Sequence, residues 1–379
     1  MLKNKNKGIT LVALVVTIVV LLILAGISIS ALTNTEIFQK AKDAKQKSAN
    51  AELDQNTKLD SYEEEISNYL PQDVKQAIKK GKPLSTDKNT EIVDEKGNKI
   101  VIPAGFKVTG DATTVDKGIV IEDATVDKDG KPTATAGSQF VWVPVGKITK
   151  EDGTKTEIKL NRYTFASDGT PTEKNNEVIN SYFSETESKG NTVAKNIVNF
   201  TNSVKANGGY YIGRYEARTT TARTASGNAL TQITEKGTDQ VYNYVTQKQA
   251  AEQAQGMYTS NNFTSDLMNS YAWDTATLFL QICGNNDTPY SRKTSVNGSL
   301  ASKGTNAVDY TGTRDKQCNV YDMASNILEW TTETSSYSDN PCVSRGGFYN
   351  VSIFCTSYRI YDIASSSLIS SGFRPLLYL

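Results

Sequence analysis

The distribution of apolar and charged residues divides the chain into two unlike parts. Ile9 to Leu32 contains no charged residue. A helix rises about 1.5 Å per residue, so a helix of this length would cross a hydrocarbon core of about 30 Å. Beyond it, apolar residues recur at three- and four-residue spacing as far as Tyr69, and Leu70-Pro71 ends the pattern. The pattern predicts a long N-terminal helix over residues 9–70, a transmembrane segment continued by a stalk.

From about residue 100 the pattern changes to short apolar stretches separated by Gly, Asp and Pro, which is typical of short strands. Residues 139–146 and 208–216 are two such strands, and residues 266–283 have the apolar spacing of a buried helix. Residues 71–99 are rich in Lys, Asp and Asn and predict a linker with a short helical piece. We therefore expect a C-terminal domain over residues 100–379.

Composition excludes several classes of chemistry. The 41 basic and 41 acidic residues balance, so nucleic acid is not an expected partner. Histidine is absent, which removes Ser/His/Asp and Cys/His catalysis and every His-ligated metal site. The four cysteines show no C-x-x-C spacing, so a zinc or thioredoxin-type site is not indicated. Disulfides and buried free thiols both remain open for these cysteines.

The N-terminus carries a short processing-site pattern. Lys7-Gly8-Ile9-Thr10-Leu11 resembles the cleavage site of type IV prepilins and pseudopilins, and three lysines precede Gly8. The resemblance implies a leader of residues 1–8, cleavage between Gly8 and Ile9, and a head on the cytoplasmic side. Ala13 stands where this family usually has Glu, which leaves filament assembly with other pilin subunits open. A plain uncleaved membrane anchor is the alternative interpretation.

Several ordered motifs of the C-terminal part are similar to those of the formylglycine-generating-enzyme (sulfatase-modifying factor) superfamily. The most recognisable runs from Asn319 to Trp330. The full set, in chain order, is 140–144, 209–216, 272–276, 319–330, 345–347, Arg359 and 372–374. The resemblance implies a C-type-lectin-like α+β fold with a small twisted sheet, two helices and long irregular loops. The expected fold class is thus α+β, with the long N-terminal helix preceding that domain.

The residues that carry the family's chemistry are missing. Its oxidase holds copper with a close cysteine pair after the Gly-Gly motif, but Val351 stands at the first position and Cys355 has no partner at the right spacing. Its iron enzymes need histidines. We therefore expect no enzymatic activity and no cofactor, with room left for a structural calcium ion near Asn319 and Asp322.

The residue types after Thr334 are restricted. Residues 334–379 contain no Lys, Glu, Gln, Met or Trp. This segment resembles the variable region of proteins diversified by retroelements, in which template Asn codons (AAC or AAT) are randomised at their adenines and never yield those five residues. A chance absence in a short Ser-rich segment is the alternative. The resemblance implies a variable region over about 346–374, with ligand-binding positions Phe348, Asn350, Val351, Ser352, Ile353, Phe354, Thr356, Ile360, Tyr361, Asp362, Ile363, Leu368 and Ile369.

Together these patterns predict a membrane-anchored, pilin-like protein of the bacterial cell surface, passing the membrane once. Its outer domain would bind a protein or glycan ligand through a segment that a retroelement diversifies, for adhesion or target recognition. Two alternatives stay open. One is a surface-tethered oxidase of the formylglycine-generating type that uses Cys355 unconventionally, and the other is a minor pilin with a structural head.

Overall fold

A computed structural model describes residues 17–21, 40, 43–48, 50–51, 55, 58, 76–78, 80–174, 197–294, 308–310, 315–349 and 353–379. The chain divides into two units, Met1–Val74 and Lys75–Leu379. In the first unit, the described residues 17–21 and 43–48 are helical and exposed. Gly8, Ile9, the predicted cleavage site between them and most of residues 9–70 lie outside the described residues.

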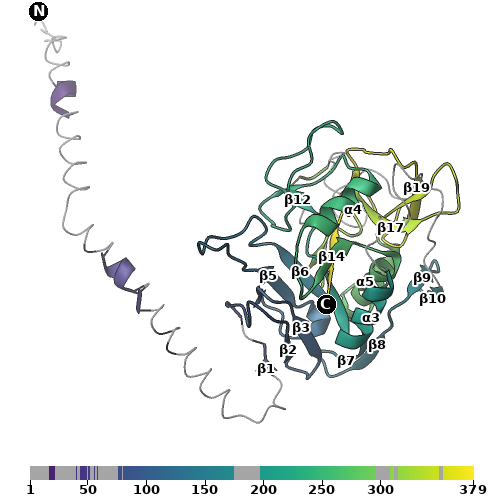
Figure 1. Cartoon of the computed structure of the whole chain (residues 1–379), viewed down its shortest axis with the longest axis horizontal. Helices are drawn as coiled ribbons and strands as arrows, with labels where there is room; N and C mark the ends of the chain where they lie inside the picture. Colours follow the sequence, from purple (N-terminus) through teal and green to yellow (C-terminus); the bar gives the residue numbers. More distant parts are fainter. Residues whose placement is uncertain are drawn as a thin grey trace, which may run out of the picture. The chain divides into compact units, whose positions relative to one another are not determined.

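The prediction of a long transmembrane helix is corrected by this structure. Among the described residues, no helix is both long enough and apolar enough to span a membrane. The expected α+β class with a long N-terminal helix is therefore wrong, and so is the localisation as a single-pass membrane protein. A charge-free run establishes the length of an apolar sequence but not the continuity of a helix through it. Where the structure is described, strands predominate and the helices are short (Figure 1).

The segment interpreted as a linker contains strands of the second unit. β1 (Gln76–Ala77) pairs in parallel with β2 (Thr90–Val93), and β2 pairs antiparallel with β3 (Lys99–Ile102). Ile92 and Ile100 are opposite each other in this ladder and fully buried. Their burial explains why the second unit begins at Lys75, before the sequence pattern indicates a domain.

An antiparallel sheet of six strands forms the largest layer of the unit. Its order is β14-β21-β11-β6-β5-β4. Trp142 of β6 and Leu377 of β21 both pair with Tyr211, which makes β11 a central strand. The strands are β4 (Phe106–Thr109), β5 (Val120–Asp123), β6 (Gln139–Pro144), β11 (Gly209–Gly213), β14 (Thr264–Leu267) and β21 (Pro375–Tyr378). The apolar stretches predicted near 139–146 and 208–216 are confirmed as strands.

In the described residues of the second unit, three helices and two 3₁₀ turns accompany this sheet. Asn269 caps the N-terminus of α5 by accepting a hydrogen bond from the backbone of Ala272. The helix predicted over 266–283 therefore begins only at Ser270, and residues 266–267 belong to β14 instead. The elements are η1 (Val115–Lys117), α3 (Ile197–Asn207), α4 (Gln247–Gly256), α5 (Ser270–Cys283) and η3 (Tyr290–Arg292).

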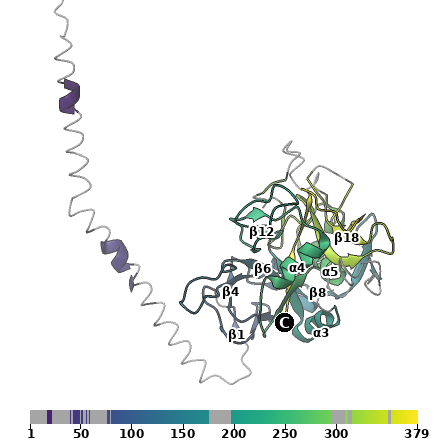
Figure 2. The same cartoon turned by 45° about the horizontal axis from the view of Figure 1, so that its top comes forward.

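A second sheet of four strands carries the C-terminal segment. Its order is β19-β18-β17-β20, with β17 and β20 parallel and the other pairs antiparallel. The strands are β17 (Leu328–Thr334), β18 (Cys342–Arg345), β19 (Arg359–Asp362) and β20 (Ser371–Phe373). β17 and β19 lie at one end of the unit, away from β1 to β3 (Figure 1), and Figure 2 shows their neighbour β18 likewise away from β1. β19 is the edge strand of this sheet.

Four two-stranded ribbons complete the described part of the unit. They are β7 (Gly146–Thr149) with β8 (Lys155–Ile158), β9 (Arg162–Phe165) with β10 (Pro171–Lys174), β12 (Arg218–Thr219) with β13 (Gln240–Val241), and β15 (Lys316–Gln317) with β16 (Val320–Tyr321). The core between sheets and helices contains Trp142, Trp273 and Trp330, each exposed by no more than 1%. Burial of such large side chains is the main stabilising contribution.

Candidate functional site

The base of the C-terminal segment is a buried cluster of arginines and carboxylates. Arg345 of β18 donates from Nη2 to Asp274 Oδ1 at 2.5 Å and from Nη1 to Glu333 Oε2 at 3.3 Å. Arg359 of β19 donates to Asp274 Oδ2 at 2.6 Å and to Glu333 Oε1 at 2.8 Å. Arg162 of β9 also pairs with Glu333. The cluster therefore ties α5, β9, β17, β18 and β19 together.

The charged groups of this cluster are buried, so their interactions affect the stability of the fold strongly. The side chains of Arg345 and Asp274 are 0% exposed, and that of Glu333 is 3% exposed. Burial lowers the pKa of Arg345, while Asp274 and Glu333 oppose that shift. Burial likewise lowers the pKa of Arg359, but the same two carboxylates outweigh it and raise the value above its ordinary range. Each charged group of the cluster has at least one partner of opposite charge, and removal of one group would leave the remaining buried charges less well compensated.

Hydrogen bonds from this base hold the backbone of the C-terminal segment. Trp273 Nε1 donates to the carbonyl oxygen of Thr356 at 2.9 Å. Arg345 donates to the carbonyl oxygens of Ser357 at 3.2 Å and Tyr358 at 3.0 Å. The backbone nitrogen of Thr356 donates to the carbonyl oxygen of Lys293 at 2.9 Å. The contacts hold main-chain atoms, so they do not depend on the identity of most side chains in the segment.

The Gly-Gly motif lets the chain approach the loop before β17. Gly346 has φ of +86°, and a Cβ there would lie 2.7 Å from the carbonyl oxygen of Met323. A Cβ on Gly347 would lie 2.4 Å from the carbonyl oxygen of Ala324. Both distances are too short for a side chain, so glycine is required where the segment leaves β18.

A second buried ion pair closes the other end of the segment. Arg374 donates to both carboxylate oxygens of Glu329, at 3.0 and 2.6 Å, and also to the carbonyl oxygens of Gly213 and Tyr321. On β17 the preceding residue, Leu328, pairs with Ser371 of β20. The motif residues on both sides of the segment are thus scaffold.

Between these two anchors, large apolar side chains reach the surface. The described residues of the second unit include nine large apolar side chains that are exposed, and six of them fall within 353–369. Their exposed fractions are Ile353 70%, Tyr358 45%, Tyr361 44%, Ile363 47%, Leu368 52% and Ile369 37%. Isolated exposed apolar residues are ordinary, but such a concentration in one short segment is typical of an interaction surface.

Aromatic side chains connect part of this surface. Phe348 and Phe354 stack with ring centroids 5.6 Å apart, and Phe354 contacts Tyr358 at 5.1 Å. Tyr361 of β19 meets Tyr337 edge to face at 5.4 Å. Phe348 and Phe354 are half-buried, so they support the exposed rings beside them.

The predicted ligand-binding positions do not form a uniform set. Thr356 is fully buried, and Ile360 and Asp362 are half-buried. Asn350, Val351 and Ser352 lie outside the described residues. The sequence prediction missed Tyr358 and Tyr337, which are 45% and 62% exposed. Both belong to the residue types that remain in residues 334–379, and this compositional signal could have found them.

In the region considered for calcium, Asn319 and Asp322 form hydrogen bonds with protein groups. Asn319 donates from Nδ2 to the carbonyl oxygen of Gly118 at 2.9 Å. Asp322 accepts at Oδ1 from the backbone of Asp315 and from Ser325 Oγ, and burial raises the pKa of its carboxyl group. Within the described residues, no three acidic or cysteine side chains are grouped in a way that could hold a metal ion.

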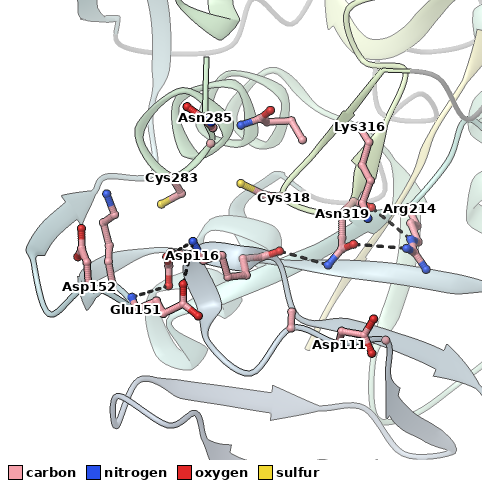
Figure 3. A pocket seen from close by; sticks show the side chains of 16 residues that line it. Asp111, Asp116, Glu151, Asp152, Arg214, Cys283, Asn285, Lys316, Cys318 and Asn319 are labelled. Carbon is pink, nitrogen blue, oxygen red and sulfur yellow. Dashed lines mark hydrogen bonds and ion pairs between the residues drawn. The ribbon is translucent and has the colours of Figure 1, made fainter. Parts of the chain in front are cut away.

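A polar pocket is lined by residues outside the C-terminal segment, Asn319 among them. It has a volume of about 700 Å³, and its lining includes Asp116, Lys117, Arg214, Cys283 and Cys318 (Figure 3). Four basic and four acidic side chains line it, so it has no strong net charge. It contains none of the predicted ligand-binding positions.

Comparison with known proteins gives limited similarity. No family model matches the chain, and no curated protein matches it. Similar solved structures include Treponema denticola variable protein 1, with 11% identity and a TM-score of 0.37 over 66% of this chain and 99% of that one. They also include PvdO from Pseudomonas aeruginosa, with 14% identity and a TM-score of 0.37 over 67% of this chain and 98% of that one. The pilin-like N-terminus finds no support in these comparisons.

Proposed function

We propose that the chain is a binding protein whose residues 348–369 present exchangeable side chains to a protein target. The observation that carries this proposal is the separation of roles within the segment. Main-chain atoms of Thr356, Ser357 and Tyr358 accept hydrogen bonds from buried scaffold groups, whereas large apolar side chains of the same segment point to solvent. A surface built in this way tolerates replacement of its contact residues.

The residue types suit recognition of a protein surface. Tyr and Ile provide large contact areas at low cost in conformational entropy, and the Ser residues between them adapt their hydrogen bonds. The exposed charges beside them are acidic, at Asp339 and in part at Asp362, while Arg345 and Arg359 are paired within the buried cluster. We therefore infer a target with an apolar patch bordered by basic side chains.

We further propose that a retroelement diversifies this segment. The support is that five residue types are missing from residues 334–379 and that the exposed positions carry permitted types. Sequencing the gene and its flanks tests this directly. We expect a near-copy of the 3′ end whose differences from the gene fall at adenines, beside a reverse-transcriptase gene. A locus without such a copy would contradict diversification but would leave the binding proposal standing.

Display of the full chain tests the binding proposal itself. One library randomises the exposed positions Ile353, Tyr361, Ile363 and Leu368 with codons that end in C or T. A matched library randomises the same number of buried positions. Both are selected against a basic lysozyme and, separately, against an immobilised glycan. We expect folded chains and lysozyme binders from the first library alone. Binders from neither library, or from the glycan arm alone, would overturn the proposal of a protein target.

Catalysis by Cys355 has no comparable support. Cys355 is 3% exposed, and its sulfur lies 3.5 Å from Ser357 Oγ. We propose that the protein is not an enzyme. Incubation with a cysteine-containing sulfatase peptide and a copper salt should leave the peptide unchanged, and turnover that disappears in Cys355→Ser would contradict this.

A further inference from the structure

Two cysteines that the proposed binding surface does not use face the same pocket. Cys283 is the last residue of α5, and Cys318 lies in the turn between β15 and β16. Both line the polar pocket, and the side chain of Cys318 extends toward Cys283 from the facing wall (Figure 3). The other two cysteines, Cys342 and Cys355, are 1% and 3% exposed and do not line this pocket.

The backbone next to Cys283 lies against the side chain of Gln317, the residue before Cys318. A Cβ on Gly284, next to Cys283, would lie 1.5 Å from Nε2 of Gln317, next to Cys318. On the other side of the turn, a Cβ on Gly118 would lie 1.8 Å from the carbonyl oxygen of Cys318. The turn between β15 and β16 is thus held against the end of α5, and a change of side-chain rotamer is a small movement for a thiol in an open pocket.

We propose that Cys283 and Cys318 form a redox pair that closes to an intramolecular disulfide in an oxidising environment. The bond would join the C-terminal end of α5 to the turn between β15 and β16 and connect two walls of the pocket. The residues that it links are about 35 apart in the sequence, so the bond would also restrict the unfolded chain considerably.

The exchange can be written with a low-molecular-weight disulfide such as oxidised glutathione as oxidant. One cysteine thiolate attacks a sulfur of glutathione disulfide, which forms a mixed disulfide and releases one glutathione thiolate. The second cysteine thiolate then attacks the protein sulfur of the mixed disulfide and releases the second glutathione. Two protein thiols are oxidised, one glutathione disulfide is reduced, and the two thiol protons end on the two glutathiones.

The surroundings of the two cysteines determine the rate of thiol–disulfide exchange. Burial raises the pKa of Cys283 to about 12, and Asp116 adds to this while Lys150 and Lys117 oppose it. Burial also raises the pKa of Cys318, reinforced by the nearby Cys283. Thiolates are therefore scarce at neutral pH, and the exchange should accelerate about tenfold for each pH unit in the range below the pKa of the attacking thiol.

The test equilibrates the full chain with oxidised and reduced glutathione, blocks remaining thiols with an alkylating agent, and maps peptides without reduction. We expect one linked peptide pair that contains Cys283 and Cys318, while Cys342 and Cys355 remain alkylated. The oxidised protein should melt at a higher temperature than the reduced protein. This difference should persist in Cys355→Ser and disappear in Cys283→Ser.

The two single variants Cys283→Ser and Cys318→Ser test the same pair independently, so one is sufficient if the other folds poorly. Cys318→Ser should accumulate glutathione on Cys283, because the resolving thiol is gone, and Cys283→Ser should do the reverse. Stable glutathione adducts on both cysteines of the unmodified chain would overturn the proposal. Both thiols still free after equilibration at pH 9 in excess glutathione disulfide, or a linkage to Cys342 or Cys355, would do so as well.

Discussion

Arg345 and Asp274 form a fully buried ion pair, with 2.5 Å between Nη2 and Oδ1, that connects β18 to α5. The same guanidinium also lies 5.6 Å from the ring of Trp273, measured from its central carbon to the ring centroid. Arg345 therefore contacts most of the buried groups that support the C-terminal segment. A planar fork with several donors can satisfy two carboxylates and two carbonyl oxygens at once, which a lysine cannot do.

We predict that Arg345→Met destabilises the protein by about 3–5 kcal/mol, because it removes the fully buried partner of Asp274 and Glu333 and leaves their charges to Arg359 and Arg162 alone. Arg345→Lys should recover only part of this loss. Urea unfolding followed by tryptophan fluorescence measures both changes. Lys159→Met is the matched control, since its ion pair with Glu173 is exposed and should contribute at most about 1 kcal/mol. Similar losses in Arg345→Met and Lys159→Met would show that the cluster is not structural.

We predict that Gly347→Ala costs about 1–3 kcal/mol, because its Cβ would press on the carbonyl oxygen of Ala324 and force the backbone to move. Gly227→Ala is the control. It has an ordinary φ and open space around its Cβ, so it should be neutral or slightly stabilising. Thermal melts of both variants give the answer. A melting temperature of Gly347→Ala equal to that of Gly227→Ala would mean that the two backbones are not in close contact.

The sequence pattern predicted the strands that are buried on both faces, because these appear as uninterrupted apolar runs. Strands β6 and β11 follow from apolar runs bounded by Gly and Pro, because a central strand buries both faces. Helix α5 was predicted to begin at Asp266, where β14 in fact continues. Strand pairing is a long-range property, so the sequence near residue 266 contains no sign that β21 pairs with it.

Within the predicted ligand-binding segment, the sequence does not distinguish exposed from buried positions. Codon-permitted residue types mark both exposed and buried positions, so Thr356 and Ile353 look alike in sequence although one is buried and the other is 70% exposed. What separates them is the hydrogen bond from Trp273 to the backbone of Thr356. The sequence also does not predict the ion pairs of Asp274 with Arg345 and Arg359, since these residues are far apart in the chain.

We predict that stability falls as pH rises above the ordinary glutamate value, in part because of Glu235. This carboxyl is fully buried, and burial raises its pKa well above the ordinary value of 4.5. The folded state then binds the proton more tightly than the unfolded state, so the contribution is present below pH 4.5 and is lost as pH rises through the folded pKa. Urea midpoints measured from pH 4 to pH 9 should show this slope.

Glu235→Gln should flatten that pH dependence, because the amide stays neutral at every pH. Glu173→Gln is the matched control, since Glu173 is exposed. The control should keep the slope of the unmodified protein. A Glu235→Gln variant whose stability still falls with pH as steeply as that of the unmodified protein would assign the slope to other groups.

We predict that the contact side chains and the scaffold respond oppositely to substitution. Ile353→Ser, Ile363→Ser and Leu368→Ser should each change the free energy of unfolding by no more than about 0.5 kcal/mol, because these side chains are exposed. Trp330→Ala should cost about 3–5 kcal/mol through lost burial and the resulting cavity. Thermal and urea unfolding measure these differences without knowledge of the ligand.

Thr356→Asn provides the sharper comparison within the same segment. The codon pattern predicts that this position is variable, but the Thr356 side chain is fully buried. A larger polar side chain there should therefore lower the free energy of unfolding by about 1–3 kcal/mol. If Thr356→Asn left the free energy of unfolding unchanged, position 356 would count again as one of the variable positions. If Ile353→Ser or Ile363→Ser destabilised the protein as strongly as Trp330→Ala, the segment would be core, and the proposed binding surface would have no exposed side chains with which to act.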